Sequence, residues 1–475
     1  MKNPSPVGMD APGLLAGRLS QAAYAQNFAD SHPPLTASQA LIEADRCYDC
    51  FNAPCTQACP AGIEVPRFIQ RIAQKNIRGA AEVILEANEL GGICARVCPT
   101  EQLCEQACVR TAQQSKPVEI GQLQRYATDT YFADPGAPLF TRGPSSGKTV
   151  AVVGAGPAGL TVAHRLARLG HEVVLFDSKP KLGGLNEYGL ATYKTTGNFA
   201  QHEIRWLLSI GGIEVRTEQM LGRDIHLAQL QQEFDAVFLG LGLAGVNSLG
   251  IPEPQVAGIC EAVDFIAALR QAEDKAELPV GRQVVVIGGG MTAVDAAVQA
   301  KKLGAREVTL VYRRGEEALK ASPEEMDWAR HNGVAVRLWA APLAVLSEGD
   351  QLTGMRFAVT AEQNGRLVET GETFTLAADM LLKAIGQRYL AEPAGAGLTL
   401  EGGRIAVDDQ GRTSLAGVWA GGDCVAGGLD LTVDAVRLGK LAAFSIDKTL
   451  RDGAVSCTSS SLTASAASSK EACHG

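Results

Sequence analysis

The stretch 150-VAVVGAGPAGLTVAHRLARLG-170 decides the fold of most of this chain. Val150–Val153 is an apolar strand, the turn Gly154–Gly159 follows it, and Leu160–Leu169 is expected to be helical. A second strand then ends at Asp177. This unit is typical of dinucleotide-binding domains, in which the glycines let a pyrophosphate approach the helix N-terminus and the acid binds ribose hydroxyls. The expected contacts are Gly154, Ala155, Gly156, Pro157, Ala158, Gly159 and Asp177.

A second glycine-rich turn, at 288–293, repeats this arrangement between the apolar run Val284–Ile287 and an alanine-rich helix. Its next strand ends in Arg313 and Arg314 instead of an acid. Arginine at this place suits the 2′-phosphate of NADPH. The alternative is a solvated charge pair at a strand end. The expected nicotinamide contacts are Gly288, Gly289, Gly290, Met291, Thr292, Arg313 and Arg314.

Two dinucleotide sites in one chain suggest one tightly bound flavin and one exchangeable nicotinamide. Near the C-terminus, a strand over 417–420 leads into Gly421-Gly422-Asp423, and a helix follows to about Lys448. This pairing resembles the C-terminal FAD motif of two-dinucleotide-binding flavoproteins. The resemblance implies that the aspartate holds the ribityl chain and that the positive helix N-terminus faces the flavin. The residues matched are Gly422, Asp423 and Thr432.

The cysteines form two groups, 47-CYDCFNAPCTQACP-60 and 94-CARVCPTEQLCEQAC-108, which contain eight of the 12 cysteines. Structural zinc sites usually use Cys-x2-Cys pairs, so zinc is the poorer alternative. In bacterial ferredoxins the last cysteine, before proline, serves the other cluster, and here Cys59 and Cys98 both precede proline. The spacing predicts two [4Fe–4S] clusters with all eight cysteines as ligands.

Composition narrows the possible functions. Hydrophobic residues make up 46% and charged residues 20% of the 475 residues, which excludes wholesale disorder. The net charge of −9 argues against a nucleic-acid partner. The sequence shows no secretory signal and no apolar run long enough to span a membrane, so no membrane partner is expected. The expected compartment is therefore a reducing cytoplasm, where the cysteines are not expected to form disulfides.

The expected fold class is α/β, with an all-helical iron–sulfur domain followed by two Rossmann-like domains. The nicotinamide domain is inserted into a discontinuous FAD domain, and the chain passes between them near 238–242 and at Ala384, Ile385 and Gly386. These last three residues are also expected cofactor contacts. The expected segments are an extension (1–36), the helical domain (37–132), a linker (133–148), the FAD domain (149–246 and 385–452), the nicotinamide domain (247–384) and a disordered serine-rich tail (453–475).

The segments 46-RCYDCFNAPCTQACP-60, 93-ICARVCPTEQLCEQAC-108 and 119-EIGQLQRYATD-129 resemble the N-terminal module of dihydropyrimidine dehydrogenase. From about Ala37 to Leu450 the chain is similar to the flavin-containing subunit of the bacterial NAD(P)-dependent enzyme. The wider group includes the small subunit of glutamate synthase. The second cysteine group and the 121–129 segment favour the pyrimidine enzyme.

This resemblance implies a ligand set that differs from the cysteine count. One cluster takes Cys47, Cys50, Cys55 and Cys108. The other takes Cys59, Cys98, Cys104 and Gln124, and leaves Cys94 as a non-ligand. Gln122 is a nearby competitor for the glutamine position. By the same resemblance, FAD contacts are Val97, Gly184, Leu185 and Lys194, and a further NADP contact is Lys320.

The resemblance also implies the reaction. FAD receives hydride from NADPH or NADH, and electrons pass through the clusters to an FMN- and Fe–S-containing partner subunit that reduces uracil or thymine. Hydride transfer requires no protein acid or base, so no catalytic residue is expected. The alternatives are the glutamate synthase small subunit and, in another class, an Fe–S/flavin redox sensor or scaffold without turnover.

Overall fold

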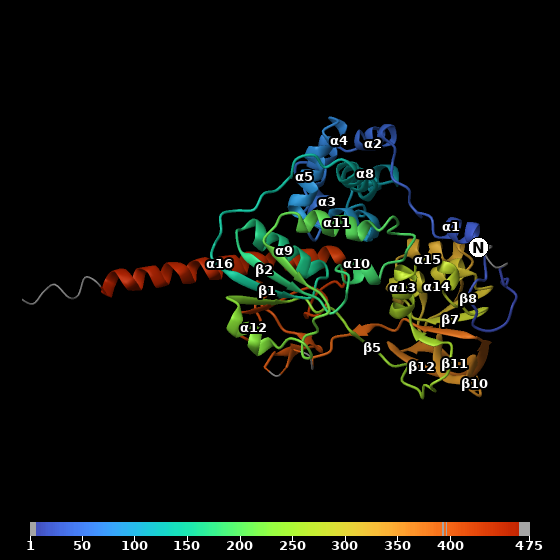
Figure 1. Ribbon diagram of the computed structural model, residues 1–475. Coiled ribbons are helices and arrows are strands. Elements are labelled where there is room, and N and C mark those ends of the chain that lie inside the picture. Colours follow the sequence, from blue (N-terminus) through green and yellow to red (C-terminus); the bar gives the residue numbers. More distant parts are fainter. Residues whose placement is uncertain (1–5, 392–393, 396, 465–475) are drawn as a thin grey trace, which may run out of the picture.

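The computed structural model describes residues 6–391, 394–395 and 397–464, with side chains described as far as Gly453. A helical domain lies above two α/β domains that stand side by side, and helix α16 projects from the FAD domain (Figure 1). Among the described residues, no helix is both long and apolar enough to cross a membrane.

The helical domain packs around apolar residues that share helix faces, among them Phe68, Ile72 and Leu123, all with no exposed surface. Apolar residues recur at helical spacing from Pro66 to Gly91-Gly92, a pattern that predicts one helical region. Instead, the chain breaks at Lys75, whose φ is +59°, and the two glycines begin a new helix. The elements are α2 (Ala37–Ala44), α3 (Pro54–Ala58), α4 (Val65–Ala73), α5 (Ile77–Ala87), α6 (Gly91–Val97), η1 (Thr100–Gln102), α7 (Val109–Gln114) and α8 (Ile120–Ala133).

The FAD domain is built on a parallel sheet in the order β17-β4-β1-β2-β3, which the apolar runs of the sequence predicted in part. The helix that follows the first fingerprint packs along α16. The strands are β1 (Thr149–Val153), β2 (Glu172–Phe176), β3 (Ile213–Arg216), β4 (Ala236–Leu239) and β17 (Val418–Ala420). The other elements are α9 (Pro157–Arg168), α10 (Leu185–Tyr188), α11 (Phe199–Leu208), α12 (Leu227–Glu233), α16 (Thr432–Ala464), β15 (Leu400–Glu401) and β16 (Arg404–Ile405).

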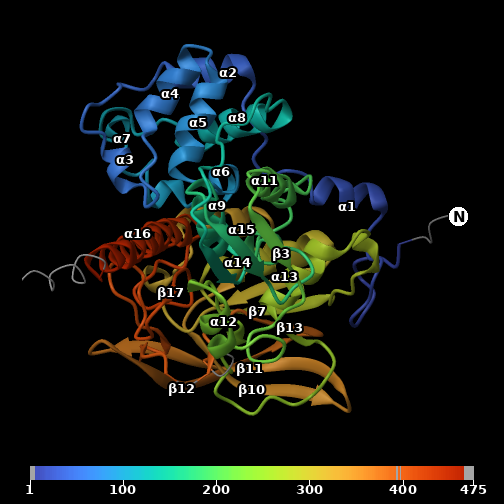
Figure 2. The ribbon, with the colours of Figure 1, turned by 60° about the vertical axis from the view of Figure 1, so that its left-hand side comes forward.

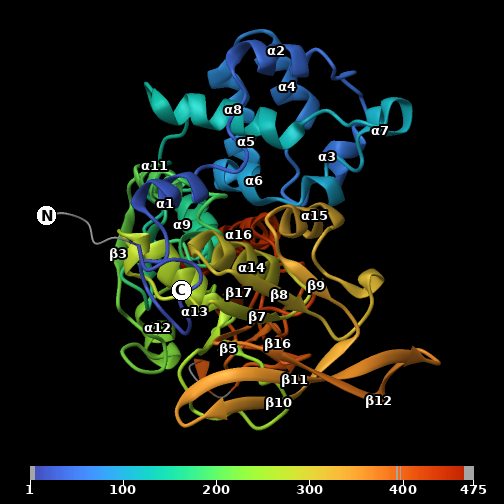
Figure 3. The same cartoon turned by 90° about the vertical axis from the view of Figure 1, so that its right-hand side faces the viewer.

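The nicotinamide domain repeats this plan with a parallel sheet in the order β6-β13-β7-β8-β9. An antiparallel sheet, β10-β11-β12, lies below it (Figures 1 and 3). This sheet was not predicted from the sequence. The elements are β6 (Ile259–Glu261), α13 (Ala262–Gln271), η2 (Lys275–Glu277), β7 (Gln283–Ile287), α14 (Met291–Leu303), β8 (Glu307–Val311), η3 (Glu316–Ala318), α15 (Pro323–His331), β9 (Ala335–Arg337), β10 (Ala340–Glu348), β11 (Gln351–Gln363), β12 (Arg366–Ala377) and β13 (Met380–Lys383).

Two connections join the α/β domains. The chain crosses between them on β5 (Gly245–Val246) and β14 (Gln387–Arg388), which pair antiparallel.

The described part of the N-terminal extension, with α1 (Gln21–Asn27), lies against the nicotinamide domain. Helix α16 continues through Ala464, beyond the expected end near Lys448. Of the tail expected to be disordered, residues 465–475 lie outside the described residues.

Candidate functional site

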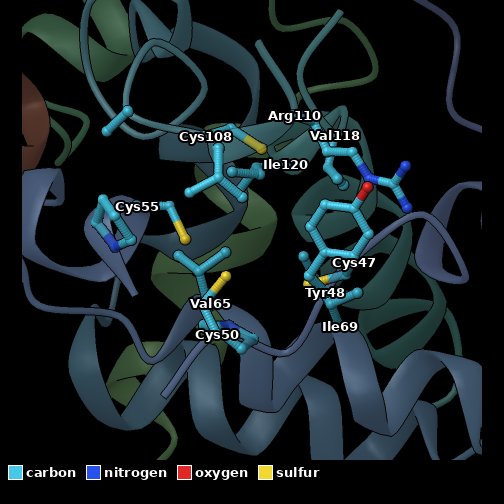
Figure 4. Close-up of a pocket in the computed structure, with 14 residues that line it drawn as sticks. Cys47, Tyr48, Cys50, Cys55, Val65, Ile69, Cys108, Arg110, Val118 and Ile120 are labelled. Carbon is cyan, nitrogen blue, oxygen red and sulfur yellow. The ribbon is translucent and has the colours of Figure 1, made fainter. Parts of the chain in front are cut away.

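The first cysteine group surrounds a pocket in the helical domain. Cys50, Cys55 and Cys108 turn their sulfur atoms toward one space, with Cys47 beside them (Figure 4). Burial raises the pKa of Cys47, and it raises the pKa of Cys55 to about 11. Partly buried thiolates of this kind are stabilised by cationic iron, so these four residues fit one [4Fe–4S] cluster. They are the four that the resemblance assigned together.

The second cysteine group lies against α6. Cys98 is hydrogen-bonded to Cys94, and this bond and burial together place the pKa of Cys98 well above its ordinary value. The thiols of Cys59 and Cys104 raise the pKa of Cys98 further through their charges. Gln124, only 7% exposed, donates from Nε2 to the Gly91 carbonyl at 2.7 Å. The structure therefore brings Gln124 to the same helix that carries Cys94.

A site for a single metal ion has a different geometry. Within the described ranges, no three His, Cys, Asp or Glu side chains are placed to hold one ion. Each cysteine of a cubane cluster binds a different iron atom, so the four sulfur atoms surround the cluster instead of meeting at one point. The cysteine arrangement thus fits a cluster better than it fits zinc.

The first dinucleotide turn is shaped by close backbone contacts. Gly154 has φ +98°, and a Cβ there would lie 2.2 Å from the Gly240 carbonyl oxygen. A Cβ on Gly159 would lie 1.9 Å from the Gly154 oxygen, so α9 can pack this closely only with glycine. A Cβ on Gly156 would lie 3.9 Å from its nearest neighbouring atom, the Gly184 Cα. The space in front of Gly156 is the expected place of the pyrophosphate.

The Cβ distances at Gly156 and Gly159 predict that substitutions there have different effects on folding and on FAD binding. Gly156→Ala is expected to fold normally, because its Cβ meets no close atom, but to weaken FAD retention at least tenfold, because the methyl group occupies the pyrophosphate approach. Gly159→Ala is expected to lower the melting temperature as well, since its Cβ overlaps a backbone oxygen. Flavin absorbance after desalting and thermal unfolding measure the two effects. Full FAD retention by Gly156→Ala would contradict this assignment.

Asp177 lies at the expected position but turns its carboxylate toward the backbone. Its Oδ2 accepts from the Ala155 N–H and its Oδ1 from the Lys179 N–H, both at 2.7 Å. Burial raises the pKa of Asp177, and these two hydrogen bonds counteract that effect. Each carboxylate oxygen has a further lone pair, so the side chain can fix the turn and also accept from ribose hydroxyls.

The residues matched to FAD by resemblance fall in two places. Gly184 packs on the first fingerprint, because its Cβ would lie 2.8 Å from the Gly156 Cα, and Leu185 follows it with 41% exposure. Val97 of α6 packs against an apolar cluster that contains Phe199 and Ala200 of the FAD domain. Lys194 lies elsewhere and pairs with two carboxylates of the nicotinamide domain.

In this buried ion-pair group, the Lys194 Nζ lies 2.9 Å from Asp295 and 2.6 Å from Glu325. Burial lowers the pKa of Lys194, but the two carboxylates outweigh burial and raise it above the ordinary value. Lys194 therefore joins the two α/β domains, a contact the resemblance did not imply.

The second dinucleotide turn repeats the backbone contacts of the first. A Cβ on Gly288 would lie 2.3 Å from the oxygen of Ala384, as one on Gly154 meets Gly240. Gly289 lies under the Tyr312 ring, where a Cβ would be 2.6 Å from two ring atoms. Gly290 caps α14 with no atom within 4 Å of its Cβ position, and Met291 and Thr292 follow in its first turn.

The basic residues beside this turn are exposed. Arg313 and Arg314 follow β8, and Lys320, whose N–H donates to the Gly289 carbonyl at 2.8 Å, closes the same loop over the glycines. Ile385 and Gly386 lead from β13 into the crossing, where the Gly386 carbonyl accepts from a backbone N–H at 3.1 Å. The structure thus places three exposed basic residues beside the turn.

The C-terminal motif lies against the first fingerprint. Gly422 has φ +78°, and its Cβ would be 3.1 Å from the Ala158 Cβ at the start of α9. Burial, followed by the charge of Asp430, raises the pKa of Asp423 to about 6. Thr432 begins α16 and donates to Asn186 Oδ1 at 2.8 Å. The structure therefore brings together the fingerprint, the Gly184 loop and the C-terminal motif.

The contact between the helical and FAD domains was not predicted. Glu203 of α11 has no exposed surface and accepts from the Gly92 N–H at 2.7 Å and from the Ile93 N–H at 3.3 Å. Burial raises the pKa of Glu203 to about 8. From α16, Lys440 donates to the carbonyls of Ala61 and Ala87, both at 2.7 Å. These bonds hold the cysteine-bearing helices above α9, α11 and α16 (Figure 2).

Two family models match this chain. Residues 24–135 match the family described as dihydropyrimidine dehydrogenase domain II, 4Fe-4S cluster. Residues 148–439 match pyridine nucleotide-disulphide oxidoreductase. The chain belongs to the pyridine nucleotide-disulphide oxidoreductase family, joined here to an iron–sulfur domain. It is an oxidoreductase with Fe–S, FAD and NAD(P)H as cofactors, and the zinc alternative is wrong.

Individual relatives refine this placement. The NAD-dependent dihydropyrimidine dehydrogenase subunit PreT of Escherichia coli (strain K12) is 35% identical over 91% of this chain and 99% of its own length. The glutamate synthase [NADPH] small chain of Halomonas elongata is 34% identical over 88% of this chain and 92% of its own. The resemblance to this wider group is confirmed.

A solved structure supports the fold of the α/β domains. Mycobacterium tuberculosis FprA, in a structure described as a complex with NADPH, superposes with a TM-score of 0.55 at 17% identity. The match covers 65% of this chain and 86% of FprA. The expected Rossmann-like architecture is confirmed.

Proposed function

We propose that this chain is the electron-input subunit of an NAD(P)-dependent dihydropyrimidine dehydrogenase, and that an FMN- and Fe–S-containing partner reduces uracil or thymine to the 5,6-dihydropyrimidine. The observation that carries the proposal is similarity to a dihydropyrimidine dehydrogenase subunit over 99% of that subunit's length. The iron–sulfur match to a dihydropyrimidine dehydrogenase domain supports it. The proposed compartment is the cytoplasm, since buried free cysteines suit a reducing environment.

The chain's own residues would hold FAD and a nicotinamide dinucleotide. The first fingerprint and Asp423 bind FAD, and Gly288–Thr292 bind the nicotinamide dinucleotide with its 2′-phosphate against Arg313 and Arg314. When bound, these groups supply hydride transfer and one-electron transfer, so the protein has to bind, orient and shield them. The contacts of Glu203 and Lys440 keep the cysteine groups beside the FAD domain.

We propose two [4Fe–4S] clusters in the helical domain. The pocket that Cys47, Cys50, Cys55 and Cys108 line supports the first. For the second, the thiols of Cys59, Cys98 and Cys104 influence one another's charge, and Gln124 completes the set. Cys94, 2% exposed, is proposed as a structural thiol that donates or accepts a hydrogen bond with Cys98.

The division of labour between subunits gives a direct test. The isolated chain is expected to oxidise NAD(P)H with ferricyanide or a tetrazolium dye, and to form no dihydrouracil, because no pyrimidine site is assigned to it. Adding the FMN-bearing partner is expected to couple this oxidation to dihydrouracil formation, measured by chromatography. The matched control omits only the partner.

Each alternative has its own result in this assay. Dihydrouracil from the chain alone would reveal a missed substrate site. Glutamate formation with a glutamine-dependent partner, and no product with the pyrimidine partner, would move the assignment to glutamate synthase. A protein that binds all its cofactors but does not turn over with any acceptor would support the sensor or scaffold alternative.

A further inference from the structure

Lys440 of α16 joins the FAD domain to a cysteine-bearing turn of the helical domain. Its side chain is partly buried and donates to the carbonyls of Ala61 and Ala87, both at 2.7 Å. Ala87 is the last residue of α5, where backbone carbonyls lack partners within the helix. Ala61 lies two residues after Cys59. One amino group therefore holds both the end of a helix and the turn that follows a proposed cluster ligand.

The turn after Cys59 directs backbone N–H groups toward the cysteine. The Gly62 N–H donates to the Cys59 carbonyl at 2.9 Å, and Gly62 has φ +70°. Burial raises the pKa of the Cys59 thiol. Hydrogen bonds from the backbone N–H groups of Ile63, Ala61 and Gly62 oppose this effect, so these groups lie close to the sulfur. Hydrogen bonds to the sulfur atoms are one of the factors that set the reduction potential of an iron–sulfur cluster.

Lys440 acts on the same turn in two ways. The carbonyl of Ala61, which accepts from Lys440, and the N–H of Gly62 belong to one peptide unit. A cation at the carbonyl polarises this unit and makes its N–H a stronger donor. The charge of Lys440 also acts directly: burial lowers the pKa of Lys440, while the negative charges of Glu89 and Cys59 act in the opposite direction.

The position of α16 gives this cation a place between two proposed redox sites. Helix α16 begins at Thr432, beside the proposed FAD site, and Lys440 follows eight residues later, about 12 Å along the helix. Glu89, a carboxylate with no exposed surface, pairs with Arg165. Among the described residues, Lys440 has no carboxylate partner of its own, so its charge is available to the cysteine turn.

We propose that Lys440 raises the midpoint potential of the second cluster, the one assigned to Cys59, Cys98, Cys104 and Gln124. This inference rests on the proposed cluster assignment. Reduction adds negative charge to the cluster, so a nearby cation and a polarised N–H donor stabilise the reduced state more than the oxidised state. Lys440 is a positioning residue that acts through the backbone of the cysteine turn. The FAD domain thus adjusts how readily the helical domain accepts an electron.

The test is a redox titration of the full-length protein with its clusters, followed by electron paramagnetic resonance. Lys440→Met keeps a side chain of similar length and removes the charge. Its iron content is expected to stay at about eight atoms per chain. The midpoint potential of one cluster is expected to fall by about 59 mV, which is a tenfold change for a one-electron couple, while the other keeps its potential. Lys448→Met, at an exposed lysine two turns further along α16, is the matched control and should move neither.

Two further variants separate the charge from the packing of the side chain. Lys440→Arg keeps the charge and is expected to retain most of the wild-type potential, whereas Lys440→Gln is expected to lower it as methionine does. In a Cys98→Ser background, which is expected to retain only the first cluster, Lys440→Met should leave the remaining potential unchanged. A shift in that background would place the effect on the first cluster and overturn the assignment to the second.

The remaining outcomes are distinct from one another. Wild-type potentials in Lys440→Met with full iron content would overturn the tuning role while both clusters stand. Wild-type protein with far fewer than eight irons would instead overturn the two proposed clusters. Loss of four irons from both neutral variants would also overturn the tuning role and leave Lys440 a residue that only holds the turn in place.

Discussion

Purified protein with Cys98→Ser is expected to carry about half the iron of the wild type, from about eight to about four atoms per chain. Cys98 directly follows α6, and its thiol interacts with those of Cys94, Cys104 and Cys59. A serine hydroxyl is a poor iron ligand, so one cluster is lost while the one at Cys47 and Cys50 remains. Iron and acid-labile sulfide analysis, with electron paramagnetic resonance of the reduced protein, measures the loss.

Cys94→Ser, four residues earlier and within α6, is the matched control. It is expected to leave the iron content nearly unchanged, because Gln124 is the proposed fourth ligand. Gln124→Ala should alter the resonance of one cluster, whereas Gln122→Ala should not. Loss of four irons from Cys94→Ser, with no effect of Gln124→Ala, would return the ligand set to eight cysteines.

NADPH is expected to be the preferred nicotinamide, and replacing Arg313 and Arg314 with glutamine should raise its Michaelis constant at least tenfold. Both arginines are exposed at the end of β8, and their backbone carbonyls are anchored by Thr360 at 2.7 Å and Trp339 at 3.2 Å. Charge-assisted hydrogen bonds contribute about 1.5–3 kcal/mol each, and about 1.4 kcal/mol is tenfold in affinity.

The constant for NADH should hardly change in this double variant, because NADH lacks the 2′-phosphate. Lys320→Gln, on the same loop, is expected to have a smaller effect of the same kind. The relatives include a subunit described as NAD-dependent and a small chain described with NADPH, so the preference has to be measured for this chain. Equal changes for both cofactors would show that the arginines do not read the phosphate.

Local sequence signals predicted the parts of the fold that depend on neighbours in the chain. Each of the two fingerprints showed its strand, its turn and its helix within about 20 residues, as expected for a βαβ unit. The break at Lys75 was missed, because apolar residues continue at helical spacing on both sides of it. The sheet β10-β11-β12 was missed because its strands alternate weakly and one face is largely exposed.

The residues that complete the site escaped prediction for a different reason. Glu203 is an ordinary helical glutamate in the sequence, and only the fold brings it to α6, more than 100 residues away. Asn186 and Thr432 are 246 residues apart. No spacing rule relates such residues. A buried carboxylate or amide at a domain contact can be found only when the two domains are seen together.

The N-terminal extension links the nicotinamide domain to the helical domain, in addition to the connections that run through the FAD domain. Leu15 forms a β-bridge with Val280 of the nicotinamide domain. The side chain of Arg18, which is 1% exposed, donates to the Val280 carbonyl at 2.9 Å. A dozen residues later, Asp30 pairs with Arg125 of the helical domain. Any rotation of the nicotinamide domain about β5 and β14 must therefore move the N-terminal extension with it or break these contacts. The extension thus keeps the nicotinamide domain at a high effective concentration beside the helical domain.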